Sequence, residues 1–185
     1  MVECARRRRI EPPHRDVVPL RQTGRMLALI TPLLILAILG TGIMAGVFFS
    51  FSGFVTQGID RLPAADAARA MRGINVTAVR APLMLALFGT GLVALAVLGF
   101  AIAGALGDAT WWAVAAAVVY LVGAIGVTGG ANVPRNNRLA AAPEAPEALA
   151  SAWNTFRPGW QAWNHVRTIT CAAACIAYAI ALVAA

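Results

Sequence analysis

The sequence lacks lysine entirely and has little charge of any kind. Charged residues make up only 12% of its 185 residues, whereas apolar residues make up 59%. A soluble domain needs a more polar surface than this composition supplies, so the bilayer is the expected solvent. All 15 basic residues are arginines, and they stand beside the long apolar stretches. Arginines in such places record topology or contact anionic lipids, so we exclude nucleic acid as a partner.

Histidine and cysteine are scarce as well. The chain has two histidines, and no acidic residue occurs in any long apolar stretch, which leaves no ligand set for a metal or a haem. Motifs for nucleotide phosphates and for serine hydrolases are also missing. Cys4, Cys171 and Cys175 do not make a disulfide framework, so the last two are expected to be packing residues. We therefore expect no metal and no other cofactor.

Long apolar stretches are what the sequence has instead. Four of them are long enough, or nearly so, to cross about 30 Å of hydrocarbon. They are residues 26–56, 81–106, 109–133 and 168–185. The first is much longer than the apolar core of a signal peptide, so we expect it to be retained. The sequence predicts an all-α fold, an integral membrane four-helix bundle in residues 26–185, after a disordered arginine-rich tail in residues 1–25.

The distribution of the arginines gives little information about the membrane topology. Seven lie on the face that would carry both termini, and eight lie on the other face. Because moving the Arg6–Arg9 cluster across the bilayer is costly, we expect the N-terminus on the cytoplasmic side of the cell membrane, with membrane lipids as partners.

Glycines recur within the first three apolar stretches. They are Gly42, Gly46, Gly89, Gly91, Gly123, Gly126 and Gly130. Small residues at such positions let membrane helices approach closely, so we expect these glycines to mark helix contacts.

The first long loop contains an amphipathic segment that begins at Pro63. At helical spacing, Met71, Ile74 and Asn75 share an apolar face, while Arg69 and Arg72 lie opposite. This pattern predicts a short interfacial helix. Asn75 is strongly polar on the apolar side, where it would either cap a neighbouring helix or contact a ligand.

The second long loop opens with several amides. Pro134 is expected to end the third helix because the residue before a proline is pushed out of helical geometry. Asn132, Asn136 and Asn137 would then satisfy the carbonyls freed at the helix end. Three amides within six residues exceed what one cap requires, so a ligand contact stays open as the alternative.

Further along this loop, Leu149, Trp153 and Phe156 recur at helical spacing and predict a second short helix that reaches Pro158. A polar stripe then follows at i, i+3, i+4 and i+7. It consists of Trp160, Trp163, Asn164 and Arg167. One interpretation is an interfacial belt at the lipid headgroups. The other, which Asn164 favours, is a polar pocket shared with the loop asparagines.

Four motifs occur in order along the chain. They are GIMAGVFFSFSGFV at residues 42–55, Met71 with Asn75, VTGGANVPRN at residues 127–136, and Trp153 followed by WQAWNHVRT at residues 160–168. Together they resemble the anthrone oxygenase family of small membrane proteins, over residues 26–185. The resemblance implies oxidation of an anthrone to an anthraquinone by O2, without metal or flavin.

The resemblance also implies roles for the polar residues. Arg167 would stabilise a developing oxyanion, while Asn75, Asn132, Asn136 and Asn164 would position the substrate by hydrogen bonds. Trp160 and Trp163 would form a stacking wall. His165 would be the candidate base of this region, although it points about 100° away from Asn164.

Two other classes of function remain. A non-enzymatic membrane protein would bind a lipid or small molecule, or would assemble with a partner subunit. A transporter is disfavoured because there are only four apolar stretches and they carry no charged residue for ion coupling.

Overall fold

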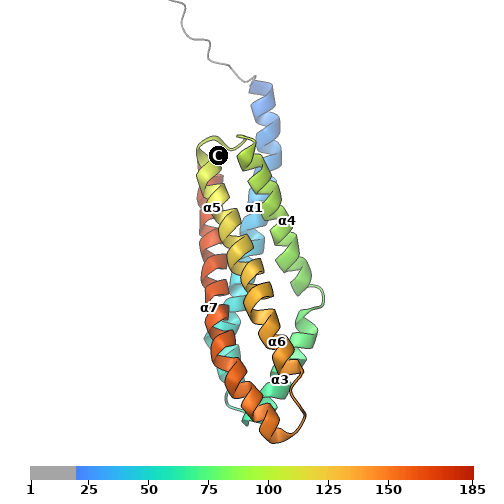
Figure 1. Cartoon of the computed structure of the whole chain (residues 1–185). Helices are drawn as coiled ribbons and strands as arrows, with labels where there is room; N and C mark the ends of the chain where they lie inside the picture. The colour runs from blue at the N-terminus through green and yellow to red at the C-terminus, as the bar shows by residue number, and fades with distance from the viewer. Residues whose placement is uncertain (1–19) are drawn as a thin grey trace, which may run out of the picture.

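The fold is a bundle of long helices packed side by side (Figure 1). A computed structural model describes residues 20–185, and every regular element within them is helical. Four helices are long and apolar enough to cross a membrane. They are Ala28–Ile59, Leu83–Ile102, Gly107–Ala140 and Pro146–Ala184. The predicted all-α four-helix membrane bundle is confirmed, and the chain is built as a multi-pass membrane protein.

The first membrane helix is α1 (Leu20–Ser50), which continues through a π-helical turn, η1 (Phe51–Val55), into α2 (Thr56–Ile59). It begins ahead of the expected start at Met26, and the rest of the predicted tail lies outside the described residues. The helix predicted in the first long loop is α3 (Ala64–Ala78), with Pro63 at its N-cap. Its apolar face buries Met71, as the spacing indicated.

The next two membrane helices are joined by a short connection. α4 (Leu83–Ile102) leads through η2 (Gly107–Ala109) into α5 (Thr110–Tyr120). The third membrane helix then continues through two π-helical stretches, η3 (Leu121–Gly126) and η4 (Thr128–Asn132), into α6 (Val133–Ala140).

Our prediction that Pro134 ends the third helix is wrong. The backbone stays helical at Val133, with φ −58° and ψ −46°. Pro134 lies in the first turn of α6, where the missing N–H of proline is tolerated. The π-helical stretch just before it changes the spacing of the backbone hydrogen bonds, which accommodates the proline without breaking the helix.

The last helix is longer than the sequence indicated. α7 (Pro146–Ala184) includes Pro158, so the segment of Trp153 and Phe156 is helical as predicted but continuous with the last membrane helix. Its 39 residues extend about 60 Å at 1.5 Å per residue, roughly twice the thickness of the hydrocarbon. Arg167 therefore lies inside a membrane helix and not in front of one.

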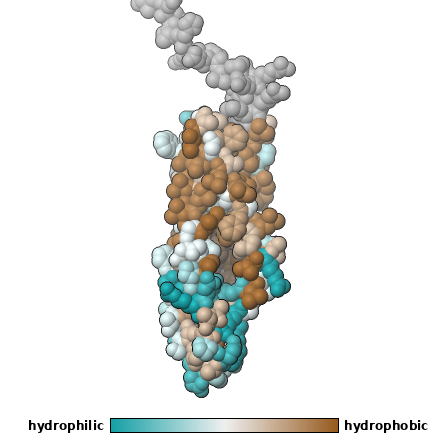
Figure 2. Space-filling model, turned by 45° about the vertical axis from the view of Figure 1, so that its right-hand side comes forward, coloured by the Kyte–Doolittle hydropathy of each residue, from teal (hydrophilic) through white to brown (hydrophobic). Residues whose placement is uncertain are grey.

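The two ends of the bundle differ in character. The C-terminus and the α4–α5 connection lie at one end, and α3 lies with the α6–α7 turn at the other (Figure 1). The surface is apolar along most of the bundle and polar at the α3 end (Figure 2). Arg69 and Arg72 of α3 pair there with Glu144 of the α6–α7 turn. The end of the bundle that contains α3 is called the polar end below.

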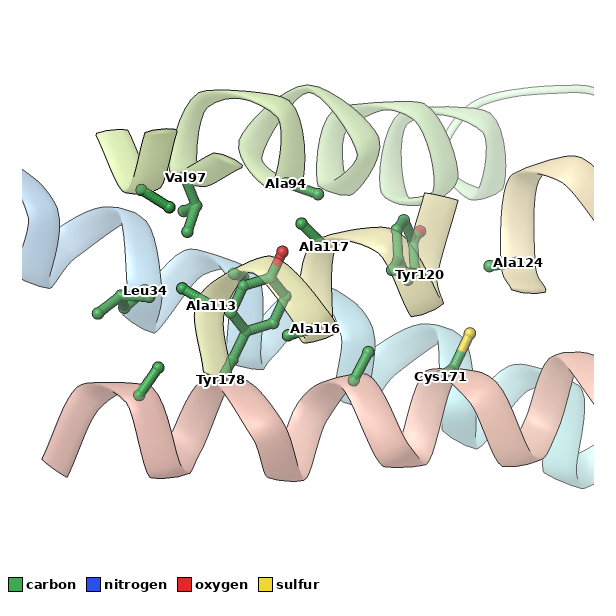
Figure 3. Close-up of a cluster of buried hydrophobic side chains, with 14 of the residues drawn as sticks. Leu34, Ala94, Val97, Ala113, Ala116, Ala117, Tyr120, Ala124, Cys171 and Tyr178 are labelled. Carbon is green, nitrogen blue, oxygen red and sulfur yellow. The ribbon is translucent and has the colours of Figure 1, made fainter. Parts of the chain in front are cut away.

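The half of the bundle away from the polar end is a closed apolar core. Tyr120 of α5 and Tyr178 of α7 are fully buried in it, among small alanines (Figure 3). The Tyr120 hydroxyl donates to the Leu87 carbonyl oxygen at 2.9 Å. Cys171 is buried in the same core and Cys175 is partly buried, and both are free thiols.

Some of the expected glycine contacts occur. A Cβ added at Gly91 would lie 2.5 Å from Ile125, and one at Gly123 would overlap Thr170. Gly46 and Gly130 face open space, and sequence reasoning missed Gly40, which lies against Thr90. Composition alone therefore identified two of the close approaches, because small residues at a membrane helix surface do not reveal which neighbour they meet.

Candidate active site

A cavity of about 100 Å³ lies where the membrane helices meet α3. Most of its lining is apolar and comes from α1, α3 and α4. The polar and indole side chains in the lining are Asn75, Thr128, Asn136, Trp160, Asn164 and Arg167. An apolar cavity with a few converging polar groups is the usual form of a small-molecule site.

Arg167 is buried in the cavity wall without an acidic partner. Only 6% of its surface is exposed, and none of the ion pairs found within residues 28–185 involves it. Its Nη2 donates to Asn164 Oδ1 at 2.8 Å, and its Nη1 donates to Thr128 Oγ1 at 3.3 Å. Buried charges are normally paired, so an unpaired arginine here leaves a positive site for a negatively charged or strongly polarised oxygen.

Two aromatic rings contact the Arg167 guanidinium. Its central carbon lies 4.2 Å from the centre of the Phe48 ring and 5.4 Å from that of Trp160. Such cation–π contacts offset part of the cost of burying the charge. Phe51 and Phe156 pack against Trp160 in turn, with ring centres 5.6 and 5.8 Å away. Arg167 and the Trp160 ring are thus held in place by packing.

Asn164 fixes the orientation of Arg167. It is fully buried, and its Nδ2 donates to the Phe48 carbonyl oxygen at 2.8 Å and to Ser52 Oγ at 2.9 Å. Its Oδ1 accepts the hydrogen bond from the Arg167 guanidinium. The amide therefore ties α7 to α1 and at the same time holds Arg167 toward the cavity.

The contacts of Asn164 and Arg167 lie beside the π-helical stretches. The Phe48 carbonyl oxygen, which accepts from Asn164, is shortly before η1 (Phe51–Val55). Thr128, which contacts Arg167, is the first residue of η4. Such π-helical stretches often occur at functional sites. Both irregular stretches therefore occur where the helices turn polar groups toward the cavity.

Four buried polar atoms of the cavity lining have no hydrogen-bond partner. They are Asn75 Nδ2, Asn136 Oδ1, Trp160 Nε1 and Arg167 Nε. Leaving a buried donor or acceptor unpaired costs roughly 1 to 3 kcal/mol, so native proteins rarely gather several around one space. Three donors and one acceptor match a ligand whose oxygens mainly accept hydrogen bonds.

The structure brings together five of the residues singled out from the sequence. Asn75 of α3, Asn136 of α6, and Trp160, Asn164 and Arg167 of α7 all line the cavity. Asn164 and Arg167 face inward, so the interfacial-belt interpretation does not hold for them. The common wall of α3, α6 and α7 arises because α3 packs back against the N-terminal half of α7.

Three of the predicted residues lie outside the cavity lining. Asn132 is buried beside it, where its Nδ2 donates to the Trp160 carbonyl oxygen at 3.2 Å and joins η4 to α7. Trp163 is 40% exposed, which fits a membrane-interface tryptophan and not a stacking wall. His165 is also exposed, and its Nε2 contacts the side chain of Gln161 at 3.3 Å.

Sequence reasoning missed Phe48 and Thr128. Phe48 lies in a motif noted at residues 42–55, but an aromatic residue in an apolar helix carries no signal that separates a ligand wall from ordinary packing. Thr128 was missed for a related reason, since the sequence does not show that its side chain, at the start of η4, meets Arg167 of α7.

A metal site is not apparent among the described residues, in which no three His, Cys, Asp or Glu side chains gather closely enough to hold an ion. The cavity presents an arginine, amides and aromatic rings. Such groups are suited to an oxygen-bearing, flat ligand and to negative charge on it.

A comparison with known protein families matches residues 81–177 to the model described as anthrone oxygenase. The match covers more than half of the chain, from α4 to the middle of the membrane part of α7. Asn136, Trp160, Asn164 and Arg167 lie within it, whereas Phe48 and Asn75 lie before it. No curated protein and no solved structure matches the chain.

Proposed function

The chain belongs to the anthrone oxygenase family, and we propose that it oxidises an anthrone-type polycyclic aromatic to the quinone in the cavity at the polar end. O2 is the oxidant, and neither metal nor flavin takes part. The observation that carries the proposal is the buried Arg167, which faces an apolar cavity without an acidic partner.

The reaction balances with O2 as the co-reactant. Loss of a proton from the methylene carbon gives an anthrone enolate, and transfer of one electron from this anion reduces O2 to superoxide. The two radicals combine at the same carbon, and protonation gives a hydroperoxide. Loss of the remaining C–H proton with cleavage of the O–O bond then releases water and leaves the second carbonyl of the quinone.

Arg167 contributes by stabilising the enolate oxygen. Preorganised donors in a water-poor site stabilise developing charge far better than they would in water, and removal of one such donor typically lowers a rate about 100- to 1,000-fold. The Arg167 Nε and the Trp160 Nε1 are both buried and free to donate to that oxygen. Because the enolate is stabilised, the methylene group of the substrate becomes more acidic. Water can then accept its proton.

Asn164 is a positioning residue in this scheme because it holds the guanidinium. Asn75 and Asn136 offer a donor and an acceptor on the α3 and α6 walls, suited to the hydroperoxide or to ring hydroxyls. The exposed position of His165 argues against its predicted role as the base.

The test is O2 uptake by purified protein in lipid nanodiscs, with anthrone as substrate and a chelator present. We expect Arg167→Gln to lower uptake about 100-fold or more. Arg61→Gln is the matched control, since Arg61 is an exposed arginine far along the chain from α7. Uptake that survives Arg167→Gln would overturn the proposal, and binding of anthrone without any uptake would identify a small-molecule binder instead.

We further propose that the N-terminus and C-terminus face the cytoplasm of a cell in which the protein lies in the cell membrane. The arginine cluster Arg6–Arg9 supports this orientation. A fluorescent protein that matures only in the cytoplasm, fused to the C-terminus, should then fluoresce. A dark fusion with normal insertion would reverse the orientation.

A further inference from the structure

A second, larger chamber lies next to the cavity, between α3 and α6. It has a volume of about 440 Å³ and opens to the surface of the bundle. Four residues line both spaces, so the two adjoin each other across these side chains. They are Asn75, Val79, Val133 and Asn136. The cavity beside Arg167 is called the inner cavity below, and the space between α3 and α6 is called the outer chamber.

The inner cavity is too small for a polycyclic ligand. A cavity of about 150 Å³ holds a single benzene ring, and sites for larger organic ligands have volumes of roughly 300 to 1,000 Å³. At about 100 Å³, the inner cavity holds no more than the equivalent of one ring. The inner cavity and the outer chamber together fall within the range for larger ligands.

The lining residues change from polar in the inner cavity to apolar and exposed in the outer chamber. This order suits one flat molecule with an oxygen at one edge. Arg167 and Trp160 line the inner cavity alone, each at least 94% buried, and their unpaired donors are suited to an oxygen. Asn75 and Asn136 follow at the junction, each with one unpaired polar atom. The outer chamber then presents Val76 and Val79, which are 58% and 69% exposed.

We propose that the ligand occupies both spaces, with its oxygen-bearing edge in the inner cavity and its remaining rings in the outer chamber between α3 and α6. This inference rests on the proposed function, because it says where the rings of that substrate lie in the same site. The inner cavity recognises an oxygen on an aromatic ring, and the outer chamber determines how many fused rings are accepted. Val76 and Ala140, on opposite walls of the outer chamber, are specificity-determining residues.

The experiment compares one ring with three. Phenol and anthrone are titrated under anaerobic conditions, so that no turnover occurs, against the full chain in nanodiscs. Val76→Phe and Ala140→Phe each fill the outer chamber from one wall, and neither residue lines the inner cavity. Both positions are exposed, so either variant is expected to fold. Val122→Phe is the matched control, because Val122 is 64% exposed elsewhere on the bundle.

We expect each outer-chamber variant to weaken anthrone binding about tenfold or more while changing phenol binding less than about twofold. The Val122→Phe control should change neither. Unchanged anthrone binding in both variants would overturn the inference, as would an equal loss for phenol and anthrone.

Arg167→Gln separates this inference from the proposed function. It should weaken both ligands, because both place an oxygen in the inner cavity. If Arg167→Gln has no effect while the outer-chamber variants discriminate by ring number, the role of the arginine fails and the two-chamber site stands.

Discussion

The two halves of the bundle bury polar groups in opposite ways. In the closed half, buried hydroxyls mostly return to the backbone, as Thr41 does to the Ala37 carbonyl oxygen and Tyr120 does to that of Leu87. At the polar end, amides and a guanidinium line a cavity, and several of their hydrogen-bonding atoms have no protein partner. The closed half is therefore organised for packing, whereas the polar end keeps groups that a bound ligand would satisfy.

A single unpaired atom is not enough to mark a site. The Tyr178 hydroxyl in the closed half also lacks a partner, yet it lies among buried alanines and not among other unpaired polar atoms (Figure 3). What distinguishes the polar end is that unpaired atoms from three helices line one cavity. Mutations should therefore affect the two halves differently, with function lost at one end and stability lost at the other.

The largest difference between the two halves is expected for Arg167→Met, which replaces the charge by an apolar side chain of similar length. Anthrone-dependent O2 uptake should fall about 100-fold or more. The melting temperature should stay the same or rise, because a buried charge without an ionic partner contributes little to stability. Uptake and thermal unfolding of the same preparation check both statements, and a large fall in melting temperature would contradict the contrast drawn here.

Asn164→Asp adds an acidic partner that the site lacks. The new carboxylate would pair with the Arg167 guanidinium, whose Nη2 lies 2.8 Å from Asn164 Oδ1. The bonds from Nδ2 to Phe48 and Ser52 would be lost as well. We expect the affinity for 4-nitrophenolate, followed by its visible absorption band, to fall about tenfold or more, since one close charge is worth at least 1.4 kcal/mol in such a site. Asn154→Asp, on the exposed face of the same helix, is the control and should have no effect.

Gly123→Ala tests the closed half. A Cβ at this position would overlap Thr170 of α7, so the helices must move apart at a cost of about 1 to 3 kcal/mol in unfolding free energy. The comparison variant is Gly130→Ala, where no atom stands within 4 Å of the added Cβ. Thermal unfolding in nanodiscs measures the difference, and equal melting temperatures for the two variants would show that the helices are not tightly packed at Gly123.

The smallest effects are expected from the two buried tyrosines. Tyr178→Phe removes a hydroxyl without a partner, so the unfolding free energy should be unchanged or higher by about 1 kcal/mol. Tyr120→Phe removes a hydrogen bond to Leu87 and should lower it by about 1 kcal/mol. Opposite signs in the two variants would support the assignment, and a loss in both would mean that Tyr178 has a partner.

Much of the fold could be predicted from the sequence because length and hydropathy determine which segments cross a bilayer. The amphipathic spacing of α3 also predicted the buried side that carries Met71 and Asn75. The helix ends were not predictable in the same way. Pro134 and Pro158 both lie within continuous helical rods, since π-helical turns and neighbouring helices compensate for the lost backbone hydrogen bonds.

The candidate site could be predicted in part because its polar residues are unusual for a membrane helix. Trp160, Asn164 and Arg167 stand within about 60° of one another around the helix axis, at about 100° per residue, and they share the inward face. Trp163 lies farther round and reaches the surface. The sequence could not reveal that Phe48 holds the arginine, because that contact depends on how α1 and α7 pack.

The hydrogen bonds and the ion pair between α3 and the α6–α7 turn have a consequence for how a substrate reaches the cavity. Arg72 donates to the carbonyl oxygens of Leu139 and Ala142 and pairs with Glu144, which fastens α3 to the end of α6 on the water side. Away from this attachment, the exposed Val79 and Val133 line both the outer chamber and the inner cavity, so this side offers an apolar entrance. A lipophilic substrate would be drawn from the bilayer, so the reaction should follow surface-dilution kinetics. Its rate would depend on the mole fraction of substrate in the lipid, and added lipid would slow it at constant total substrate.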